Sequence, residues 1–379
     1  MSTWPRHSLG EQVTKVPWAQ QGVNAAGRRI LDGDADAKVG RTLASDSNSA
    51  YHIPALPLPE RGLIARIRRR ARPSPAVIAG IGDDCAILRI RAGHEFLVTT
   101  DFSLEGVHFR RQWHPPESVG HRCLARGLSD IAAMGGDPVA AFLSLALPAK
   151  LPQRWVDRFF DGLLALAAEF KVTLAGGDTA QSPGGILADI VVLGSVPRGN
   201  AVLRSNARLG DRVYVSGTLG GSAATLDLLN SKRRKKLRPD LYPEHFFPTP
   251  LIKLGQILRQ QGIASAMIDI SDGFSTDLAH ICVESGVGAE IREDLLPLAK
   301  VGQAARSVDV RFALHGGEDY QLLFTAPKEQ AVPAVIGGVA ITEVGVITKS
   351  KDILLAHTNQ RRSKLKPLGW EHFRKHTLR

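Results

Sequence analysis

The chain has 379 residues, of which 44% are hydrophobic and 22% charged, an ordinary composition for a globular protein with room for two hydrophobic cores. Its formal net charge of +11 makes nucleic-acid binding a hypothesis to consider. No motif with interleaved aromatic residues accompanies the basic runs, however, so we expect no nucleic-acid partner. Three scattered cysteines without Cys-x-x-Cys spacing, no secretory signal and no apolar run near the roughly 20 residues of a membrane span predict a cytoplasmic protein without a disulfide framework, a zinc site or a membrane partner.

The first expected helix begins only after a long stretch without apolar periodicity. Residues 1–55 carry Gly, Ala, Ser, Asn and Asp without such a pattern, which predicts a disordered extension outside the fold. A Pro-rich hinge follows, and the helical spacing of Leu63, Ile64 and Ile67 then predicts a helix that starts at residue 60 and ends at residue 70. We expect the folded body to begin there.

The next unit alternates short strands with longer helices. The expected strands are 96–100, 139–146, 172–175 and 186–196, and the expected helices are 116–134 and 152–170. The punctuation Pro197-Arg198-Gly199-Asn200 predicts a boundary between an N-terminal domain, 56–198, and a C-terminal domain, 199–379.

The second unit is also mixed, so the chain is expected to have a two-domain fold of the α+β or α/β class. Its expected strands are 212–215, 266–268 and 320–324, its expected helices are 222–229, 251–260 and 275–284, and 230–250 is expected to be a basic loop. The segment Gly217-Thr218-Leu219-Gly220-Gly221 lacks both the Gly-Lys-Ser/Thr and the Gly-x-Gly-x-x-Gly patterns, so we interpret it as a tight turn from a strand to a helix.

Six acidic motifs, each a carboxylate beside Gly or Ser, interrupt this basic chain. They are Gly82-Asp83-Asp84, Thr100-Asp101, Ser129-Asp130, Gly177-Asp178, Asp269-Ile270-Ser271-Asp272-Gly273 and Gly317-Glu318-Asp319. Each motif alone is also the ordinary composition of a turn or a helix cap. Three of them follow apolar runs, so their carboxylates are expected to project from strand ends toward a common edge. Since Mg²⁺ takes oxygen ligands and shares them with substrate phosphates, the six together favour a dispersed magnesium and polyphosphate site.

An ordered series of blocks resembles the thiamine-monophosphate kinase family. The blocks are 80–86, Thr99-Thr100-Asp101, Gly106-Val107-His108-Phe109, 128–135, Gly176-Gly177-Asp178-Thr179, 269–273, 316–320 and the terminal Gly369-Trp370-Glu371-His372-Phe373. The match runs from about residue 60 to the C-terminus. A wider superfamily, which includes aminoimidazole ribonucleotide synthetase, selenophosphate synthetase and a hydrogenase maturation factor, shares the architecture but not this whole set.

The resemblance implies a fold and an activity. The implied activity is the ATP-dependent phosphorylation of thiamine monophosphate to thiamine diphosphate, with several Mg²⁺ ions and with ATP as co-substrate. The implied fold has an N-terminal α+β domain whose sheet pairs with its twin across a homodimer, a C-terminal α/β domain, and an ATP cleft between the two domains.

The resemblance also implies roles for individual residues. The implied metal ligands are Asp84, Thr99, Thr100, Asp101, Asp130, Asp178, Asp269 and Asp272. The implied ATP-binding residues are Gly177, Asp178, Arg204 and Ser271, and the implied contacts to thiamine monophosphate are His108, Glu318 and Trp370 or Phe373. Among all of these, Asp101, Asp130 and Asp272 are the expected catalytic residues.

These roles agree with the chemistry that the reaction needs. A phosphate monoester has a second pKa of about 6 and is already a nucleophilic anion at neutral pH, so no strong general base is required. The obstacle is to bring two anions together in line, and Mg²⁺ ions remove it by neutralising and orienting both. Simpler alternatives stay open, because Arg204 can be a surface charge, His108 a satisfied polar group and the terminal aromatic residues part of a core.

The chain also departs from the family pattern. Gly127 stands where the family commonly has Asn, which predicts the loss of a polar contact near Asp130, and Phe274 stands where Leu is usual. The resemblance does not explain residues 1–55 or the basic run 232–236. Two alternative functions remain: another ATP-dependent synthetase of the same superfamily, and a basic nucleic-acid-binding protein on this scaffold.

Overall fold

The computed structural model describes residues 60–72, 74–81, 86–231 and 237–373. The expected extension 1–55, the predicted ligand Asp84 and the basic run 232–236 lie outside the described residues. Within the described residues, no helix combines the length and the apolar character that crossing a membrane requires.

The described chain begins with helix α1 (Glu60–Arg70), which has the predicted bounds. Leu63 and Ile67, one turn apart, are buried, as the helical spacing predicted. On the outer side, Arg66 pairs with Asp157 and Arg70 with Asp161, so part of this basic run is already neutralised by acidic side chains. A short antiparallel pair, β1 (Val77–Ala79) and β2 (Ile87–Leu88), follows.

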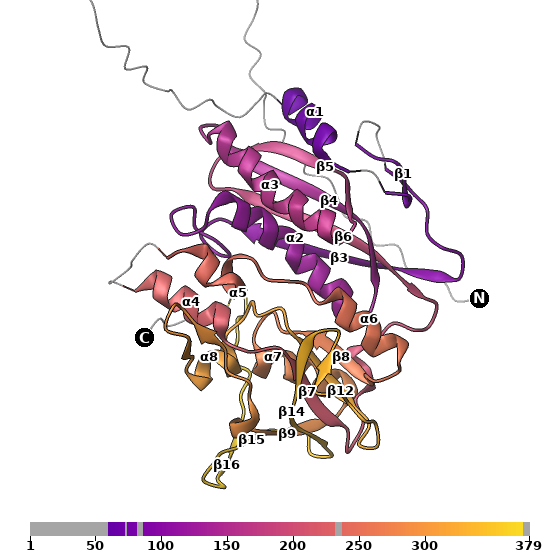
Figure 1. The fold of residues 1–379 in the computed structure, drawn as a ribbon, viewed down its shortest axis with the longest axis vertical. Helices are drawn as coiled ribbons and strands as arrows, with labels where there is room; N and C mark the ends of the chain where they lie inside the picture. The colour runs from indigo at the N-terminus through magenta and orange to yellow at the C-terminus, as the bar shows by residue number, and fades with distance from the viewer. Residues whose placement is uncertain (1–59, 73, 82–85, 232–236, 374–379) are drawn as a thin grey trace, which may run out of the picture. The chain divides into compact units, whose positions relative to one another are not determined.

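The first large sheet has four strands and is covered on one face by two helices (Figure 1). The strands are β3 (His94–Leu104), β4 (Asp137–Pro148), β5 (Thr173–Ser182) and β6 (Leu187–Pro197), in the order β3-β6-β4-β5. The β4–β5 pair is parallel and the other two pairs are antiparallel. The covering helices are α2 (Pro116–Ala133) and α3 (Gln153–Glu169).

The expectation that Asp101 and Asp178 end strands at a common edge was wrong. Asp101 lies inside β3, because the alternation of inward and outward side chains continues through the polar residues to Leu104. Asp178 lies inside β5, where Gly177 continues the strand. In addition, β3 and β5 form opposite edges of the sheet.

Glycine allows α2 and α3 to lie unusually close together. A Cβ atom on Gly120 would lie 1.9 Å from the carbonyl oxygen of Phe159, and one on Gly162 would lie 1.9 Å from that of Glu117. The two backbones therefore touch at these positions, and the buried side chains of Phe159 and Leu163 pack around the contact. The two helices therefore pack as one tight layer on this face of the sheet.

The other face of this sheet carries exposed apolar side chains. Along β3 the exposed fractions of Phe96, Val98 and Phe102 are 47%, 65% and 54%. These three residues alternate with partly buried Leu97 and Thr99, which are on the side of the helices. Exposed apolar side chains grouped in this way are typical of interaction surfaces.

The second large sheet is mixed and mainly antiparallel. Its main path is β16-β15-β9-β14-β7-β12-β8, with β13 paired to β14, and the β9–β15 pair is parallel. The strands are β7 (Arg212–Ser216), β8 (Ala266–Asp269), β9 (Gly288–Arg292), β12 (Leu322–Ala326), β13 (Val335–Ile336), β14 (Val339–Thr348), β15 (Ile353–Ala356) and β16 (Arg362–Lys364). The two-domain α/β class with mixed sheets is confirmed, although the strands beyond residue 326 were not resolved from the sequence.

Three helices of this half are close to their predicted bounds: α4 (Gly221–Asn230), α6 (Ile252–Gln260) and α7 (Phe274–Ser285). The short helix α8 (Val310–His315) was not predicted from the sequence. The smaller elements are η1 (Arg204–Asn206), η2 (Pro239–Leu241), η3 (Glu293–Leu295), β10 (Lys300–Val301) and β11 (Arg306–Ser307). A short helix, α5 (Pro243–Phe246), interrupts the stretch predicted as a loop, because Pro243 begins a turn that buries His245 and Phe246.

Helix α2 joins the two halves. Besides the first sheet it contacts α5, α6 and β8. Gly255 of α6 lies so close to α2 that a Cβ atom there would be 2.0 Å from the carbonyl oxygen of Ala132. One buried apolar cluster includes Leu128 of α2, Leu258 of α6 and Phe324 of β12. Functional side chains on α2 are therefore positioned relative to both sheets.

Candidate active site

The acidic side chains that the structure brings together come from β3, α2 and β8. The Thr99 hydroxyl of β3 donates a hydrogen bond to the Asp130 carboxylate of α2. The neighbouring Ser129 Oγ donates to Asp269 Oδ2 at 2.7 Å. Asp101 is beside Asp130, and the nearby carboxylate of Asp130 makes ionisation of Asp101 less favourable. Four predicted metal ligands, Thr99, Asp101, Asp130 and Asp269, therefore form one cluster.

The carboxylates of this cluster are difficult to ionise without a cation. Burial and the adjacent charge of Asp130 raise the pKa of Asp101 to about 7. The same two causes raise the pKa of Asp269 to about 8. Burial also raises the pKa of Asp130, against the hydrogen bond from Thr99. Buried like charges repel one another, so a bound cation would restore the ionised forms.

Asp272 follows Asp269 by three residues and lies in the loop before α7. Its carboxylate, that of Asp277 and a ring nitrogen of His280 offer ligand atoms within 4.8 Å of one another. Asp277 already accepts hydrogen bonds from the backbone N–H groups of Asp272 and Gly273, at 3.2 and 3.0 Å, so its first role is to hold the loop. Burial raises the pKa of Asp272.

Two other predicted metal ligands, Thr100 and Asp178, lie on the open face of the first sheet. Thr100 Oγ1 donates to Asp189 Oδ1 at 2.7 Å. The strand register places Asp178, Ser144, Asp189 and Phe102 in one row across the sheet, so they share that face. The structure therefore separates Thr100 and Asp178 from the cluster around Asp130.

The predicted ATP-binding residues are likewise in two places. Gly177 and Asp178 line a cavity of about 630 Å³ along the β5 edge, together with α1 and the segment around Ile81. Arg204 and Ser271 are on the other side, where Arg204 is in electrostatic contact with Asp130 and Asp269 and the Ser271 carbonyl accepts from the Glu318 N–H at 2.7 Å.

Glu318 is held by two arginines of α2. Arg122 Nη2 donates to Glu318 Oε2 at 2.6 Å, and Arg126 Nη2 donates to the other carboxylate oxygen. Burial alone would raise the pKa of Glu318, but the two guanidinium groups outweigh it and lower that pKa. Glu318 also has a φ of 64°, and Tyr320 one of 50°, so both adopt a left-handed conformation that only Gly adopts easily.

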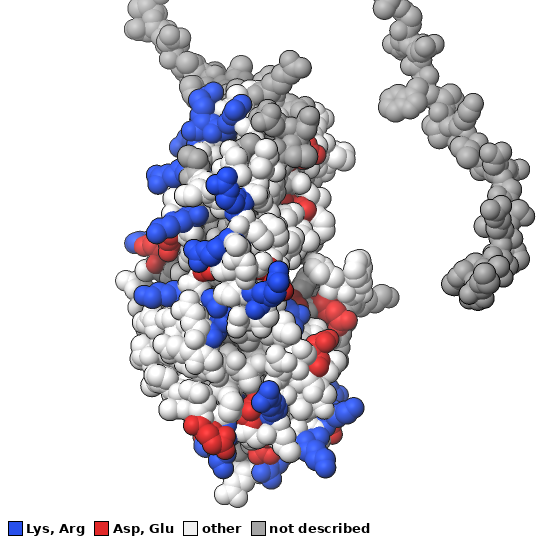
Figure 2. Space-filling view, turned by 90° about the vertical axis from the view of Figure 1, so that its right-hand side faces the viewer, with Lys and Arg blue, Asp and Glu red and all other residues white. Residues whose placement is uncertain are grey.

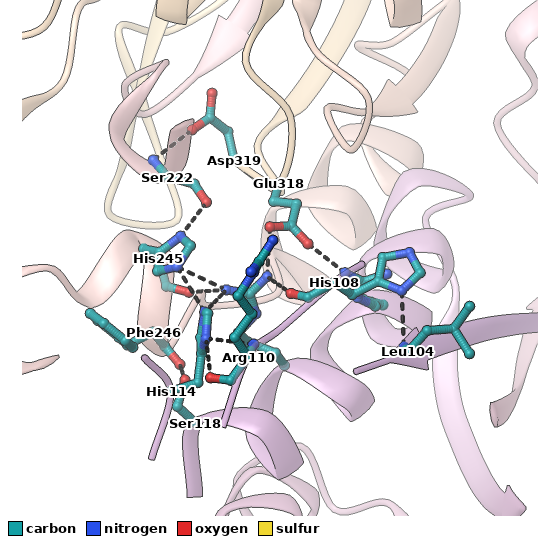
Figure 3. Close-up of polar contacts among 12 residues, drawn as sticks. Leu104, His108, Arg110, His114, Ser118, Ser222, His245, Phe246, Glu318 and Asp319 are labelled. Carbon is teal, nitrogen blue, oxygen red and sulfur yellow. Dashed lines mark hydrogen bonds and ion pairs between the residues drawn. The ribbon is translucent and has the colours of Figure 1, made fainter. Parts of the chain in front are cut away.

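His108 is next to this pair of arginines (Figure 3). Its Nδ1 accepts a hydrogen bond from the Leu104 N–H at 3.0 Å, which leaves the ring proton on Nε2. Burial and the charge of Arg126 lower the pKa of His108 to about 3, so the ring is neutral at physiological pH. Its ring centroid lies 5.6 Å from that of His372.

The C-terminal segment is fixed to the loop that carries Asp272. The Trp370 N–H donates to the Asp272 carbonyl at 2.9 Å, and the Trp370 and His372 ring centroids are 5.6 Å apart. Trp370 is 42% exposed, whereas Phe373 is fully exposed at its surface position. Of the two aromatic candidates for thiamine contact, this arrangement favours Trp370.

A buried polar network of Ser222, His245 and His114 (Figure 3) contacts Arg122. Ser222 Oγ lies 3.0 Å from His245 Nδ1, and His245 Nε2 lies 3.0 Å from His114 Nε2. Arg122 Nη1 donates to the His245 carbonyl at 2.9 Å. The network ties α4 and α5 of the second half to α2.

The Gly-rich turn before α4 receives another buried carboxylate. Asp319 accepts from the N–H groups of Gly220 and Ser222 at 2.7 and 3.4 Å, while burial raises its pKa to about 7. Gly220 has a φ of 85°, as a tight turn requires. Among the described contacts, this turn serves to anchor the loop of Glu318.

Gly127 does not have the consequence expected from the sequence. A Cβ atom there would lie 2.5 Å from Val192 Cγ2, so position 127 is on the side of α2 that packs against β6. An Asn side chain would require Val192 to move. We find close packing of the helix on the sheet at this position rather than a missing polar contact.

Several polar residues of the site were not recognised from the sequence. They are Arg122, Arg126, Asp189, His114, His245 and His372. For Arg122 and Arg126 there was a signal, because two arginines four residues apart on the apolar face of a helix must find buried partners. With Asp130 they form a series with a spacing of four residues, which corresponds to steps of about 6 Å along α2. The helix thus places cations and a carboxylate along one line.

This arrangement can bind cations and phosphates side by side. Carboxylates and a hydroxyl at one end of α2 offer the oxygen ligands that Mg²⁺ prefers. The two arginines toward the other end offer the planar donor groups that suit phosphate and carboxylate. The geometry therefore suits phosphoryl transfer between two anions.

Comparison with known proteins agrees with this chemistry. Two family models match: AIR synthase related protein, N-terminal domain, at residues 82–196, and its C-terminal domain at residues 208–356. The thiamine-monophosphate kinase of Salmonella typhimurium is 42% identical over 298 residues, which cover 76% of this chain and 89% of that protein. That of Escherichia coli K12 is 38% identical over 83% of this chain and 98% of the relative.

Solved structures extend the comparison. The thiamine-monophosphate kinase of Stenotrophomonas maltophilia has a TM-score of 0.69 at 36% identity and covers 77% of this chain and 95% of its own. A structure described as AaThiL complexed with AMPPCP and TMP has a TM-score of 0.65 at 35% identity, over 83% of this chain and 96% of its own. The chain belongs to the thiamine-monophosphate kinase family.

Proposed function

We propose that this chain transfers the γ-phosphoryl group of ATP directly to the phosphate of thiamine monophosphate and so forms thiamine diphosphate. The observation that carries the proposal is that one helix, α2, presents two kinds of site. Asp130 joins the acidic cluster, and Arg126 and Arg122, four and eight residues before it on the same helix, hold Glu318. The chain belongs to a family with this activity, and a relative has been solved with AMPPCP and TMP.

The acidic cluster fits Mg²⁺. Its described donors are carboxylate and hydroxyl oxygens, and the raised pKa values of Asp101 and Asp269 mark a site that gains from a cation. The residues that would hold the ions there are Thr99, Asp101, Asp130, Asp269 and Asp272. Thr100 and Asp178, with Asp189, would serve a separate position on the open face, and Asp84 stays a prediction. Bound Mg²⁺ would neutralise and orient the two phosphates.

The side chains of the protein then position the reactants. No strong base is needed, because the acceptor phosphate is already an anion. Arg204 beside Asp130 and Asp269 would contact the phosphates of ATP, with Ser271 and the Gly177-Asp178 segment as further nucleotide contacts. His108 is neutral and has its proton on Nε2, so it can donate a hydrogen bond to the acceptor phosphate.

The thiamine rings would lie near the C-terminal segment. Trp370 and His372 are held beside Asp272 and His108, and Trp370 offers an aromatic face to a cationic ring. Both carboxylate oxygens of Glu318 are engaged by arginines, so Glu318 would contact thiamine only through its remaining lone pairs. Phe373 is the less suitable aromatic contact, because it is fully exposed.

We also propose the larger organisation that the family implies. The exposed Phe96, Val98 and Phe102 support pairing of the first sheet with its twin in a homodimer. The domains would be 56–198 and 199–379, with the ATP cleft between them and α2 at the junction. On the face shown in Figure 2, Lys and Arg side chains lie with Asp and Glu among them. The excess of positive charge would steer anionic nucleotides toward the acidic site, and we expect the protein to act in the cytoplasm.

A direct assay tests the activity. Purified protein is incubated with ATP, thiamine monophosphate and Mg²⁺, and thiamine diphosphate and ADP are separated and quantified by chromatography. We expect one ADP for each thiamine diphosphate and no product in excess EDTA. Folded protein that forms no thiamine diphosphate, or that forms it equally well without a divalent cation, would contradict the proposal. Parallel reactions contain unphosphorylated thiamine or an aminoimidazole-type compound in place of thiamine monophosphate. The acceptor that supports ADP formation distinguishes the kinase from a synthetase of the same superfamily.

A further inference from the structure

The two arginines that hold Glu318 are not equivalent. Arg122 is 3% exposed, and both terminal nitrogens are engaged: Nη1 donates to the His245 carbonyl at 2.9 Å and Nη2 to Glu318 at 2.6 Å. Arg126 is also buried, with Nη1 donating to the Phe102 carbonyl at 3.0 Å and Nη2 to Glu318. Arg126 Nε, however, is buried and has no hydrogen-bond partner among the described residues.

The charges around Glu318 do not balance. Two guanidinium groups share one carboxylate, which leaves a surplus of one positive charge in a buried position. The neighbouring histidines do not change this sum, since His108 and His114 are neutral at physiological pH. A buried cation without a full partner is unfavourable, so an anion is expected to complete the group.

The carboxylates near Arg126 are committed elsewhere. The positive charge of Arg126 acts to lower the pKa of both Asp101 and Asp272, but these two carboxylates are among the proposed magnesium ligands. His108, the proposed contact to the acceptor phosphate, also feels the charge of Arg126. Arg126 therefore lies between the proposed metal ligands and the proposed substrate contacts, where an acceptor phosphate has to be placed.

We infer that Arg126 binds the phosphate of thiamine monophosphate and thereby makes the site select a phosphorylated thiamine over thiamine itself. This inference rests on the proposed function. The phosphate can bind the Arg126 guanidinium together with Glu318 or displace Glu318 from it. The unpaired Nε–H of Arg126 then gains a hydrogen-bond acceptor when the phosphate binds. Arg122 Nε is not among the buried nitrogens without a partner in the described residues, and Arg122 Nη2 donates to the His108 carbonyl at 3.3 Å as well as to Glu318, so the role of Arg122 is to position Glu318.

The test compares two ligands that differ only in the phosphate. Dissociation constants of thiamine and thiamine monophosphate are measured by calorimetry in the presence of Mg²⁺ and a non-hydrolysable ATP analogue, for the wild type and for Arg126→Gln. We expect Arg126→Gln to weaken thiamine monophosphate by about tenfold or more, while the constant for thiamine changes by less than about threefold. An unchanged constant for thiamine monophosphate, or an equal change for both ligands, would overturn the inference.

Arg122→Gln is the matched control, because it removes the same charge from the same carboxylate one helical turn away. We expect it to weaken thiamine and thiamine monophosphate to a similar extent, since it acts through the position of Glu318. A selective loss of thiamine monophosphate binding in Arg122→Gln equal to that in Arg126→Gln would remove the distinction between the two arginines and overturn the assignment.

Two further measurements keep the test decisive. If Arg126→Gln does not fold, Arg126→Lys keeps the charge but not the planar donor group, and we expect a loss of several-fold for thiamine monophosphate only. Binding of both ligands to folded Arg126→Lys with wild-type constants would overturn the inference. Turnover by the wild type is measured alongside: its absence contradicts the proposed function, whereas normal wild-type turnover with unaltered variants contradicts only the role of Arg126.

Discussion

Ser129 Oγ donates a hydrogen bond to Asp269 Oδ2 at 2.7 Å, which joins α2 to the last residue of β8 across 140 positions of the chain. The next residue, Asp130, accepts from Thr99 of β3. Two adjacent side chains of one helix therefore form hydrogen bonds with side chains of both sheets. The proposed magnesium site is complete only when both halves are folded against α2.

Replacing Asp130 should remove activity and leave the fold intact. We expect Asp130→Asn to lower kcat by at least about 100-fold, because it removes a proposed metal ligand. The melting temperature in EDTA should stay equal or rise, since the change removes repulsion between Asp130 and Asp101. Steady-state kinetics and thermal denaturation give the two quantities. Activity within a few-fold of the wild type would show that Asp130 has a structural role.

Trp370 should contribute to thiamine binding more than to ATP binding. We expect Trp370→Ala to raise the KM for thiamine monophosphate by roughly 3- to 30-fold and to change the KM for ATP much less, as the loss of an aromatic contact to a cationic ring predicts. Phe373→Ala, at the fully exposed neighbour, is the control and should change neither value appreciably. Equal increases in both KM values after Trp370→Ala would indicate a folding role instead.

Gly177 should not tolerate even the smallest side chain. Its φ is 145°, and a Cβ atom would lie 1.9 Å from the carbonyl oxygen of Leu143 on the paired strand β4. We expect Gly177→Ala to reduce the free energy of unfolding by roughly 3 kcal/mol. Gly184→Ala, in the turn after β5 where a Cβ atom meets open space, is the control for chemical denaturation. Similar midpoints for the two variants would contradict this prediction.

The buried histidines should make the protein sensitive to acid. Burial and the charge of Arg122 lower the pKa of His114 to about 4, whereas in the unfolded chain it is 6.5. Between these values the unfolded state binds a proton that the native state does not. The stability from the neutral ring is therefore present above pH 6.5 and is lost as the pH falls toward 4.

A variant isolates this contribution from the titration of other groups. The difference in unfolding free energy between the wild type and His114→Gln should shrink by about 1.4 kcal/mol for each pH unit below 6.5. Urea denaturation at a series of pH values from 7.5 to about 4.5 measures it. A difference that does not depend on pH would show that His114 does not stay neutral in the native protein.

The open face of the first sheet should hold a dimer together. Val98 is 65% exposed on that face, so we expect Val98→Glu to shift the sedimentation coefficient from that of a dimer to that of a monomer. Val283→Glu, at an exposed position of α7 in the other half, is the matched control and should leave the assembly unchanged. A wild-type protein that sediments as a monomer would contradict the proposed pairing.

The sequence predicted most elements because their apolar periodicity is local. The bounds of α1 agree with the prediction, those of α2 and α6 differ from it by one residue at one end, and those of α3 by one residue at each end. Two strand predictions ended too early, at the end of the apolar run: at Thr100 in β3 and at Ala175 in β5. Polar side chains on an open sheet face keep the period of two, but their low hydropathy hides it.

Proximity of the site residues was harder to predict than their identity. The acidic motifs pointed to Asp101, Asp130 and Asp269, and these residues do form one cluster. The position of Asp178 on the far edge depends on the strand order β3-β6-β4-β5, which no local pattern contains. The partners of Glu318 were also missed, because Arg126 meets it across 192 positions of the chain.

The spacing of Arg122, Arg126 and Asp130 along α2 makes the length of this helix a functional constraint. One residue inserted between Arg126 and Asp130 would turn everything after it by about 100° and move Asp130 away from Thr99. The number of residues between Arg126 and Asp130 therefore sets the distance between the proposed phosphate-binding and metal-binding ends of α2. Substitutions in this segment can be compensated by neighbouring side chains, but insertions and deletions cannot.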